Sequence, residues 1–377
     1  MDPNPVDSRP VAATAPTASS SPAGPAGAGD AAVDSAPAPA SLDPADRQRE
    51  RNAAHPERGP LFPATVPWRA VLVFLLVALG GAWLVMLPVW LSGEGLTSPL
   101  FGVLTSAMMF TPTLAAFVVV LFVNRPPSIP RLLGLGPLRP VKRTLGMVLL
   151  ASVLLSVLPL AALFLGSAMG LVKLDLAHFS ALAATLEAAG QPHSPEDVSR
   201  AVVMQLALIP LIIVIDAFAT FGEELGWRGW LLPNLRPLGT LPALGLSGAI
   251  WGVWHAPIIL LGYNYQRTDA LGVLLMTGWC VLLGVVVGWM RLRSASVWPA
   301  VFAHAALNAT TNIYMIFVDR DSVATSTWGS ILGWSGWIVL GLTIVVLLAT
   351  GQLRKQPKPG LTLAETQPGA AARVTIR

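Results

Sequence analysis

The sequence predicts an all-α polytopic membrane protein with about eight transmembrane helices and a polar cavity enclosed among them. Of its residues, 54% are hydrophobic and only 12% are charged, compared with about 25% charged residues in ordinary globular proteins. Apolar runs of about 20 residues, long enough to cross a hydrocarbon core, recur between residues 68 and 349. Several ionisable residues nevertheless lie in or beside these runs, where they are costly unless they pair or line a polar cavity.

The apolar runs separate into eight predicted spans. The third run is longer than a bilayer requires, so we expect it to tilt or to extend along the interface. The segment 173–200 is expected to be an external loop with a short interfacial helix. Ser194 is predicted to be the N-cap of a helix there, with Pro195 at its first position. The predicted spans are approximately 68–91, 99–123, 144–172, 211–232, 244–262, 270–290, 295–317 and 328–350.

Two tails flank the predicted membrane domain at 61–350. Residues 1–60 are rich in Ala, Pro and Ser, and residues 351–377 are again polar and rich in Pro. Such segments bury too little apolar surface to offset chain entropy, so both tails are expected to be disordered. The first sixty residues contain no apolar signal-peptide core, so we expect the first span to act as the insertion signal.

The loop charges predict a multi-pass protein of the plasma membrane with both termini in the cytoplasm. Basic residues gather in alternate loops, as the positive-inside rule requires, and the intervening loops are acidic or poor in basic residues. The formal charge of +4 therefore reflects contact with the lipid bilayer and does not indicate a nucleic-acid partner. The basic residues are Arg125, Arg131, Arg139, Lys142, Arg143, Arg236, Arg291, Arg293, Arg354, Lys355 and Lys358, and the acidic ones include Glu94, Glu187, Asp197, Asp319 and Asp321.

The stretch Phe221–Trp230 places two carboxylates and a guanidinium directly after an apolar run. Glu224 and Arg228 are four residues apart with the acid first, which is the favourable order for an ion pair on one helix. Their pairing leaves Glu223 free to face another direction. A buried carboxylate without a cation of its own is suited to general-base chemistry.

Two later spans carry further polar side chains. His255 lies in the fifth span, and His304 and Asn308 lie four residues apart in the seventh, on one helix face. At about 1.5 Å per residue, Glu223, His255 and His304 lie about 18, 16 and 14 Å into their spans. We therefore expect all of these groups at a common depth near the middle of the membrane.

Such a set of side chains allows amide hydrolysis in two ways. In one, Glu223 and His255 activate a water molecule while His304 and Asn308 stabilise the oxyanion. In the other, Glu223, His255 and His304 bind Zn²⁺ and leave its fourth position open to water. No HExxH motif favours the metal, and the residues alone leave both mechanisms open.

The order EExxxR, aromatic-xxx-His and HxxxN resembles the CPBP (CAAX-processing and bacteriocin-processing) family of intramembrane proteases, which includes type II CAAX prenyl protease. The resemblance covers about residues 200–312. It implies an eight-helix core and endopeptidase activity, by a metal or a glutamate mechanism. Trp251 stands where the family usually has Phe, four residues before the histidine. The catalytic residues carried over are Glu223, Glu224, Arg228, His255, His304 and Asn308.

Some residues outside these motifs carry secondary expectations. Asp216, seven residues before Glu223, is expected either to touch the site or to bond a neighbouring helix. Cys280 is the single cysteine, which excludes a disulfide framework, and it is expected to be a packing residue. Gly284 and Gly288 form a small-xxx-small pattern for packing within the bundle. The tryptophans expected to line the cavity are Trp227, Trp230 and Trp254.

The favoured interpretation is an intramembrane endopeptidase that acts on a membrane-associated protein or peptide. The alternatives are a non-catalytic immunity or scaffold protein on the same fold and a transporter that relays charge. A relay needs ionisable groups graded across the bilayer, whereas these are expected at one depth. The Ala- and Pro-rich tails indicate a bacterium with a GC-rich genome, where prenylated substrates are not expected.

Overall fold

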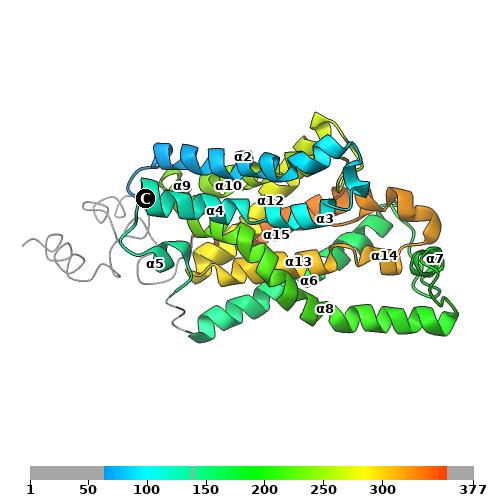
Figure 1. The fold of residues 1–377 in the computed structure, drawn as a ribbon. Helices are drawn as coiled ribbons and strands as arrows, with labels where there is room; N and C mark the ends of the chain where they lie inside the picture. The colour runs from blue at the N-terminus through cyan, green and yellow to red at the C-terminus, as the bar shows by residue number, and fades with distance from the viewer. Residues whose placement is uncertain (1–62, 137, 139–140, 355–377) are drawn as a thin grey trace, which may run out of the picture. The chain divides into compact units, whose positions relative to one another are not determined.

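A computed structural model of the protein describes residues 63–136, 138 and 141–354. The predicted tail at 1–60 and most of the one at 351–377 lie outside the described residues. Within them the chain is helical, and the strand-like pairing is limited to one antiparallel bridge between Leu174 and Val318. The predicted all-α membrane fold is therefore confirmed (Figure 1).

Six helical stretches among the described residues are long and apolar enough to cross a membrane. The predicted spans 244–262 and 295–317 correspond to α10 and α13, which have 15 and 14 residues. At about 1.5 Å per residue these helices extend only about 22 Å, less than a core of about 30 Å. The helices are α2 Trp68–Ser92, α3 Phe101–Met108, α4 Thr111–Val118, α5 Ile129–Leu133, α6 Val141–Ala168, α7 Ser180–Ala188, α8 Pro195–Glu224, α9 Leu232–Leu235, α10 Thr240–Trp254, α11 Ala256–Ile259, α12 Ala270–Ser294, α13 Trp298–Thr311, α14 Tyr314–Phe317 and α15 Trp334–Ala349.

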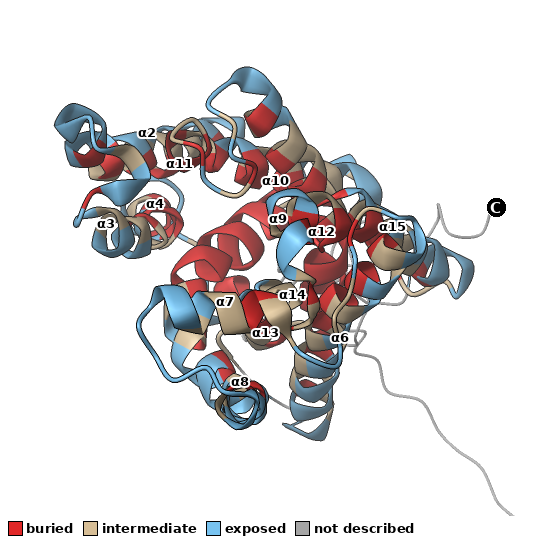
Figure 2. Ribbon diagram, turned by 90° about the vertical axis from the view of Figure 1, so that its right-hand side faces the viewer, coloured by how far each residue is buried: buried red, intermediate tan, exposed pale blue. Residues whose placement is uncertain are grey.

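Helix α8 begins sixteen residues earlier than the predicted fourth span. Ser194 caps it by accepting a hydrogen bond from the Asp197 N–H, and Pro195 is its first residue. The predicted cap is therefore present, but it opens the long helix that leads to Glu223 instead of a separate interfacial helix; α7 is the short helix of this region. Much of α8 is exposed (Figure 2), including large apolar side chains, as is usual for a helix that contacts lipid.

Helix α8 continues into a π-helical segment, Leu225–Leu231, that packs through glycines. Gly222 lies against Phe110, and a Cβ at Gly226 would stand 2.4 Å from Pro112 of α4. Gly229 would place a Cβ 3.1 Å from the Leu133 carbonyl oxygen. Glycine thus brings one side of this segment against α4 and α5, and π-helical turns occur frequently at functional sites.

Helices α10 and α12 also approach closely through glycines. A Cβ at Gly248 would lie 2.8 Å from the Cys280 carbonyl oxygen, and one at Gly252 would lie 2.3 Å from the Thr277 Cα. A Cβ at Gly284 would lie 3.1 Å from the Gly248 Cα. The expected small-residue packing within the bundle is confirmed, and it holds α10 so that His255, directly after it, faces the centre of the bundle.

The loop before α7 is fixed by a carboxylate outside the membrane-spanning segments. Asp175 accepts hydrogen bonds from the backbone N–H groups of His178, Ala177 and Ser180. These bonds, that from His178 foremost, lower the pKa of Asp175 to about 2. Ser180 Oγ in turn accepts a hydrogen bond from the Arg320 N–H, so the loops before α7 and after α14 meet.

Candidate functional site

A cavity of about 420 Å³ is lined by residues of α3, α8, α10, α12 and α13, among others. Its lining includes Glu223 at the end of α8, His255 directly after α10, and His304 and Asn308 on α13. Polar groups from three predicted spans therefore share one cavity. The expectation that His304 and Asn308 lie on one face of their helix agrees with this arrangement.

Glu223 is buried at the inner part of this lining, with 3% of its surface exposed. Its Oε2 accepts a hydrogen bond of 2.7 Å from the indole Nε1 of Trp251. Because an indole only donates, this contact orients the carboxylate without competing for its other oxygen. The sequence indicates only that Trp251 supplies an aromatic ring, and it does not predict the hydrogen bond from Trp251 to Glu223.

Glu224 faces away from the cavity into a buried polar cluster. Its Oε1 accepts from Arg228 Nη1 at 2.7 Å, so the predicted ion pair is present. The same oxygen accepts from His304 Nδ1 at 3.0 Å. The Arg228 guanidinium also stacks on the Trp251 ring, 4.2 Å from its centroid. Glu224 and Arg228 are absent from the cavity lining, so they can act on the chemistry only through their contacts with His304 and Trp251.

The two histidines have different hydrogen-bonding partners. His255 Nδ1 lies 2.9 Å from the Trp251 carbonyl oxygen, which only accepts, so the proton is on Nδ1 and Nε2 carries a lone pair. His304 Nδ1 donates to the Glu224 carboxylate, and its Nε2 donates when the ring carries a second proton. His255 can thus accept a hydrogen bond from water, while a doubly protonated His304 can donate one from Nε2.

Asp216 satisfies both of its expected roles. It lines the cavity, and its Oδ2 accepts a hydrogen bond of 3.0 Å from Asn308 Nδ2, which links α8 to α13. The second hydrogen of the Asn308 amide remains for another acceptor. Asn308 is exposed and lies within the lining, so that acceptor can be a bound peptide.

The zinc set Glu223, His255 and His304 stays a prediction. The hydrogen bonds at Nδ1 of His255 and His304 leave Nε2 of each ring available, so these bonds alone do not distinguish water from a metal as its partner. Among the described residues, no three His, Cys, Asp or Glu side chains are gathered closely enough to hold a metal ion. We therefore derive no chemical step through a metal.

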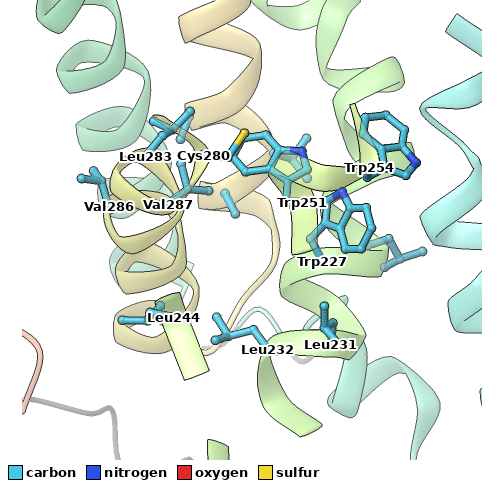
Figure 3. Packing of buried hydrophobic residues seen from close by; sticks show 14 of the residues in the cluster. Trp227, Leu231, Leu232, Leu244, Trp251, Trp254, Cys280, Leu283, Val286 and Val287 are labelled. Atoms are coloured by element: carbon cyan, nitrogen blue, oxygen red, sulfur yellow. The ribbon is translucent and has the colours of Figure 1, made fainter. Parts of the chain in front are cut away.

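The expectation that Trp227 and Trp230 line the cavity is wrong, whereas Trp254 does line it. Trp227 and Trp230 belong to the π-helical segment and pack on Phe74 of α2, with ring centroids 5.6 and 4.7 Å away. Figure 3 shows Trp227 within the buried apolar cluster, where Trp251 lies between Cys280 and Trp254. Cys280 is fully buried, as expected of a packing residue, with Sγ 4.0 Å from His255 Nδ1.

Comparison with known proteins agrees with the motif order. Residues 205–310 match the family described as type II CAAX prenyl endopeptidase Rce1-like. The core of the chain is therefore similar to CAAX prenyl endopeptidases. A relative, CAAX prenyl protease 2 of Methanococcus maripaludis, is 29% identical over 123 residues, which are 31% of this chain and 45% of that protein. The segment 205–310 contains every predicted catalytic residue, while the alignment spans less than half of the relative's length.

Arg228→Ala is expected to reduce the yield and thermal stability of the folded protein. It leaves the Glu224 carboxylate buried without its cation, which typically costs about 3–5 kcal/mol. Adding Glu224→Gln should recover part of the loss, measured by size-exclusion yield and melting temperature in detergent. Arg200→Ala is the control, because its pair with Asp197 is exposed and such pairs contribute about 0–1 kcal/mol. A double variant no more stable than Arg228→Ala would contradict the pairing.

Proposed function

We propose that this protein is an intramembrane endopeptidase that hydrolyses a peptide bond of a membrane-associated protein or peptide. The observation that carries the proposal is the division of roles within one cavity. Glu223 and His255 present hydrogen-bond acceptors, while His304 and Asn308 present donors. Hydrolysis of an amide needs both kinds of group, the first for water and the second for the developing oxyanion.

In the first step, water is held by Glu223 and by Nε2 of His255. Glu223 takes one proton of the water as its oxygen forms a bond to the carbonyl carbon of the peptide. The carbonyl oxygen becomes an oxyanion, which accepts hydrogen bonds from His304 Nε2 and Asn308 Nδ2. Glu224 accepts the Nδ1 proton of His304 and so holds Nε2 toward the oxyanion, and this preorganised donor pair requires no solvent reorganisation.

In the second step, the tetrahedral intermediate collapses. Glu223 gives its proton to the amide nitrogen, the C–N bond breaks, and the products are a carboxylic acid and an amine. The carboxylate that acted as base is thereby regenerated. Trp251 has a positioning role, because its bond to Oε2 leaves Oε1 of Glu223 for the water.

The substrate is proposed to be a polypeptide held at the bilayer, because the cavity lies among helices that face lipid. The archaeal relative is named as a prenyl protease, which would suggest a prenylated substrate. The Ala- and Pro-rich tails of this chain favour a bacterial source, in which prenylated proteins are not expected. We place the protein in the plasma membrane with both termini in the cytoplasm. A non-catalytic immunity or scaffold role on this fold and a transporter role are the competing functions.

Glu223→Gln tests the function. It keeps a carbonyl oxygen for Trp251 but removes the base, so turnover should fall to background. Membranes from cells with wild-type protein or the variant would be compared by N-terminal peptide profiling for uncleaved precursors. The control is Glu187→Gln, because Glu187 is an exposed carboxylate on α7.

Precursors that accumulate with Glu223→Gln and not with Glu187→Gln would support proteolysis. Identical peptide profiles in the wild type and both variants would reject it. A growth or immunity phenotype that Glu223→Gln leaves intact would favour the non-catalytic role. Loss of ion flux without any change in peptides would favour the transporter.

Metal content separates the two hydrolytic mechanisms. With Glu223 as base, active purified protein should contain no stoichiometric zinc by elemental analysis, and chelation should leave activity unchanged. If zinc were bound by Glu223, His255 and His304, each single replacement would deplete it, because metal affinity depends on the full ligand set. Zinc at one ion per chain that is lost in His304→Ala would overturn the glutamate mechanism.

Asn308→Ala should lower kcat by about 10²–10³ with little change in KM, as loss of one oxyanion donor does. Because Asn308 also bonds Asp216, the matched control is Asp216→Ala, which removes the acceptor of that bond and leaves Asn308 in place. Asp216→Ala should lower kcat far less than Asn308→Ala. Equal losses in the two variants would show that Asn308 acts by linking α8 to α13.

A further inference from the structure

The geometry points to access from one side only: we infer that the cavity opens on the extracytoplasmic face and takes polypeptide segments presented there. The inference about the substrate rests on the proposed function. The side of the membrane on which the cavity opens can be tested without measuring proteolysis. Three observations carry it: which elements line the cavity, what closes its other end, and how charge is distributed along the bundle.

The outer lining of the cavity comes from loops that meet at one end of the bundle. Tyr263 and Asn264 belong to the loop after α11, Asn312 follows α13, and Thr327 and Ser330 lie in the loop before α15. These loops are joined to one another, since the Tyr265 hydroxyl donates to the Leu332 carbonyl oxygen and Tyr263 packs on Phe101. In Figure 1 this is the end that carries α7 and α14.

The opposite end is closed beneath Glu223. Below it, Trp227 and Trp230 pack on Phe74 (the cluster that includes Trp227 is shown in Figure 3), and Gly226 and Gly229 bring the π-helical segment against α4 and α5. Arg291, itself fully buried, donates to the carbonyl oxygens of Arg228 and Leu132. The cavity lining includes no residue of α5, α9 or the loop between α12 and α13.

Charge separates these two ends sharply within the described residues. The closed end carries nine basic residues and no acidic one, while the open end carries four basic and eight acidic residues. Basic residues remain on the cytoplasmic side, so the open end is extracytoplasmic. The basic residues of the closed end are Arg69, Arg125, Arg131, Lys142, Arg143, Arg236, Arg291, Arg293 and Arg354; at the open end the basic ones are Lys173, Arg200, Arg267 and Arg320, and the acidic ones are Glu94, Asp175, Glu187, Glu196, Asp197, Asp269, Asp319 and Asp321.

This orientation defines the class of substrate. A peptide bond reaches Glu223 only from the outer leaflet or the space beyond it, so the cleaved segment belongs to an exported or outward-facing membrane polypeptide. The mouth carries amide and hydroxyl side chains, such as Asn264, Asn312 and Thr327, together with aromatic rings. Such a lining suits an extended backbone, whose N–H and C=O groups need partners at membrane depth.

Cysteine accessibility in spheroplasts tests the orientation. Asn312→Cys and Asn264→Cys place a thiol in the cavity mouth, and Asn124→Cys places one on the exposed loop after α4 at the closed end. The full-length variants would be treated with a membrane-impermeant maleimide before and after permeabilisation. Wild-type protein gives the background, because its single cysteine, Cys280, is buried.

Cavity-mouth thiols should label in intact spheroplasts as fully as in permeabilised ones, whereas Asn124→Cys should label only after permeabilisation. The reverse pattern, or equal labelling of both ends in intact spheroplasts, would overturn the inference. Two mouth positions keep the test decisive if one variant folds poorly. Labelling requires no proteolysis, so a catalytically silent protein with this pattern would refute the proposed function and leave the orientation standing.

Discussion

The buried carboxylate of Glu224 is the interaction on which the site depends. One of its oxygens, Oε1, accepts from both Arg228 and His304, and so ties α8, the π-helical segment and α13 together. A buried charge that loses its partner costs about 3–5 kcal/mol, a large share of a total stability of about 5–15 kcal/mol. The same carboxylate fixes which nitrogen of His304 faces the cavity, so stability and chemistry share one contact.

The adjacent residues Glu223 and Glu224 point in different directions because a third face of the same backbone segment packs against neighbouring helices. Glycines at 222, 226 and 229 press that side against α4 and α5. Glu223 then turns to the cavity and Trp251, while Glu224 turns to Arg228. A side chain at Gly226 would push against the Pro112 backbone, and the relation between the two carboxylates would change.

The sequence predicted most of what depends on spacing along one helix. The pair Glu224 and Arg228, the shared face of His304 and Asn308, and the gathering of three spans around one cavity agree with the structure. It did not predict what depends on rotation between elements. Trp227 and Trp230 belong to the π-helical segment and pack on Phe74 instead of lining the cavity, and a pattern assumed to be α-helical gives no sign of a π-helix.

His255 and His304 differ in whether Nε2 accepts or donates a hydrogen bond, because the partners of their Nδ1 atoms differ. A backbone carbonyl next to His255 leaves a lone pair at Nε2, whereas a carboxylate next to His304 supports a second proton on the ring. The carbonyl belongs to Trp251, whose indole also holds Glu223 and whose ring carries Arg228. One tryptophan therefore contacts the proposed base, orients the water-binding histidine and packs on the cation that neutralises Glu224. A phenylalanine there would keep the carbonyl and the ring but lose the bond to Glu223, so the indole nitrogen is the part of this residue that orients the carboxylate.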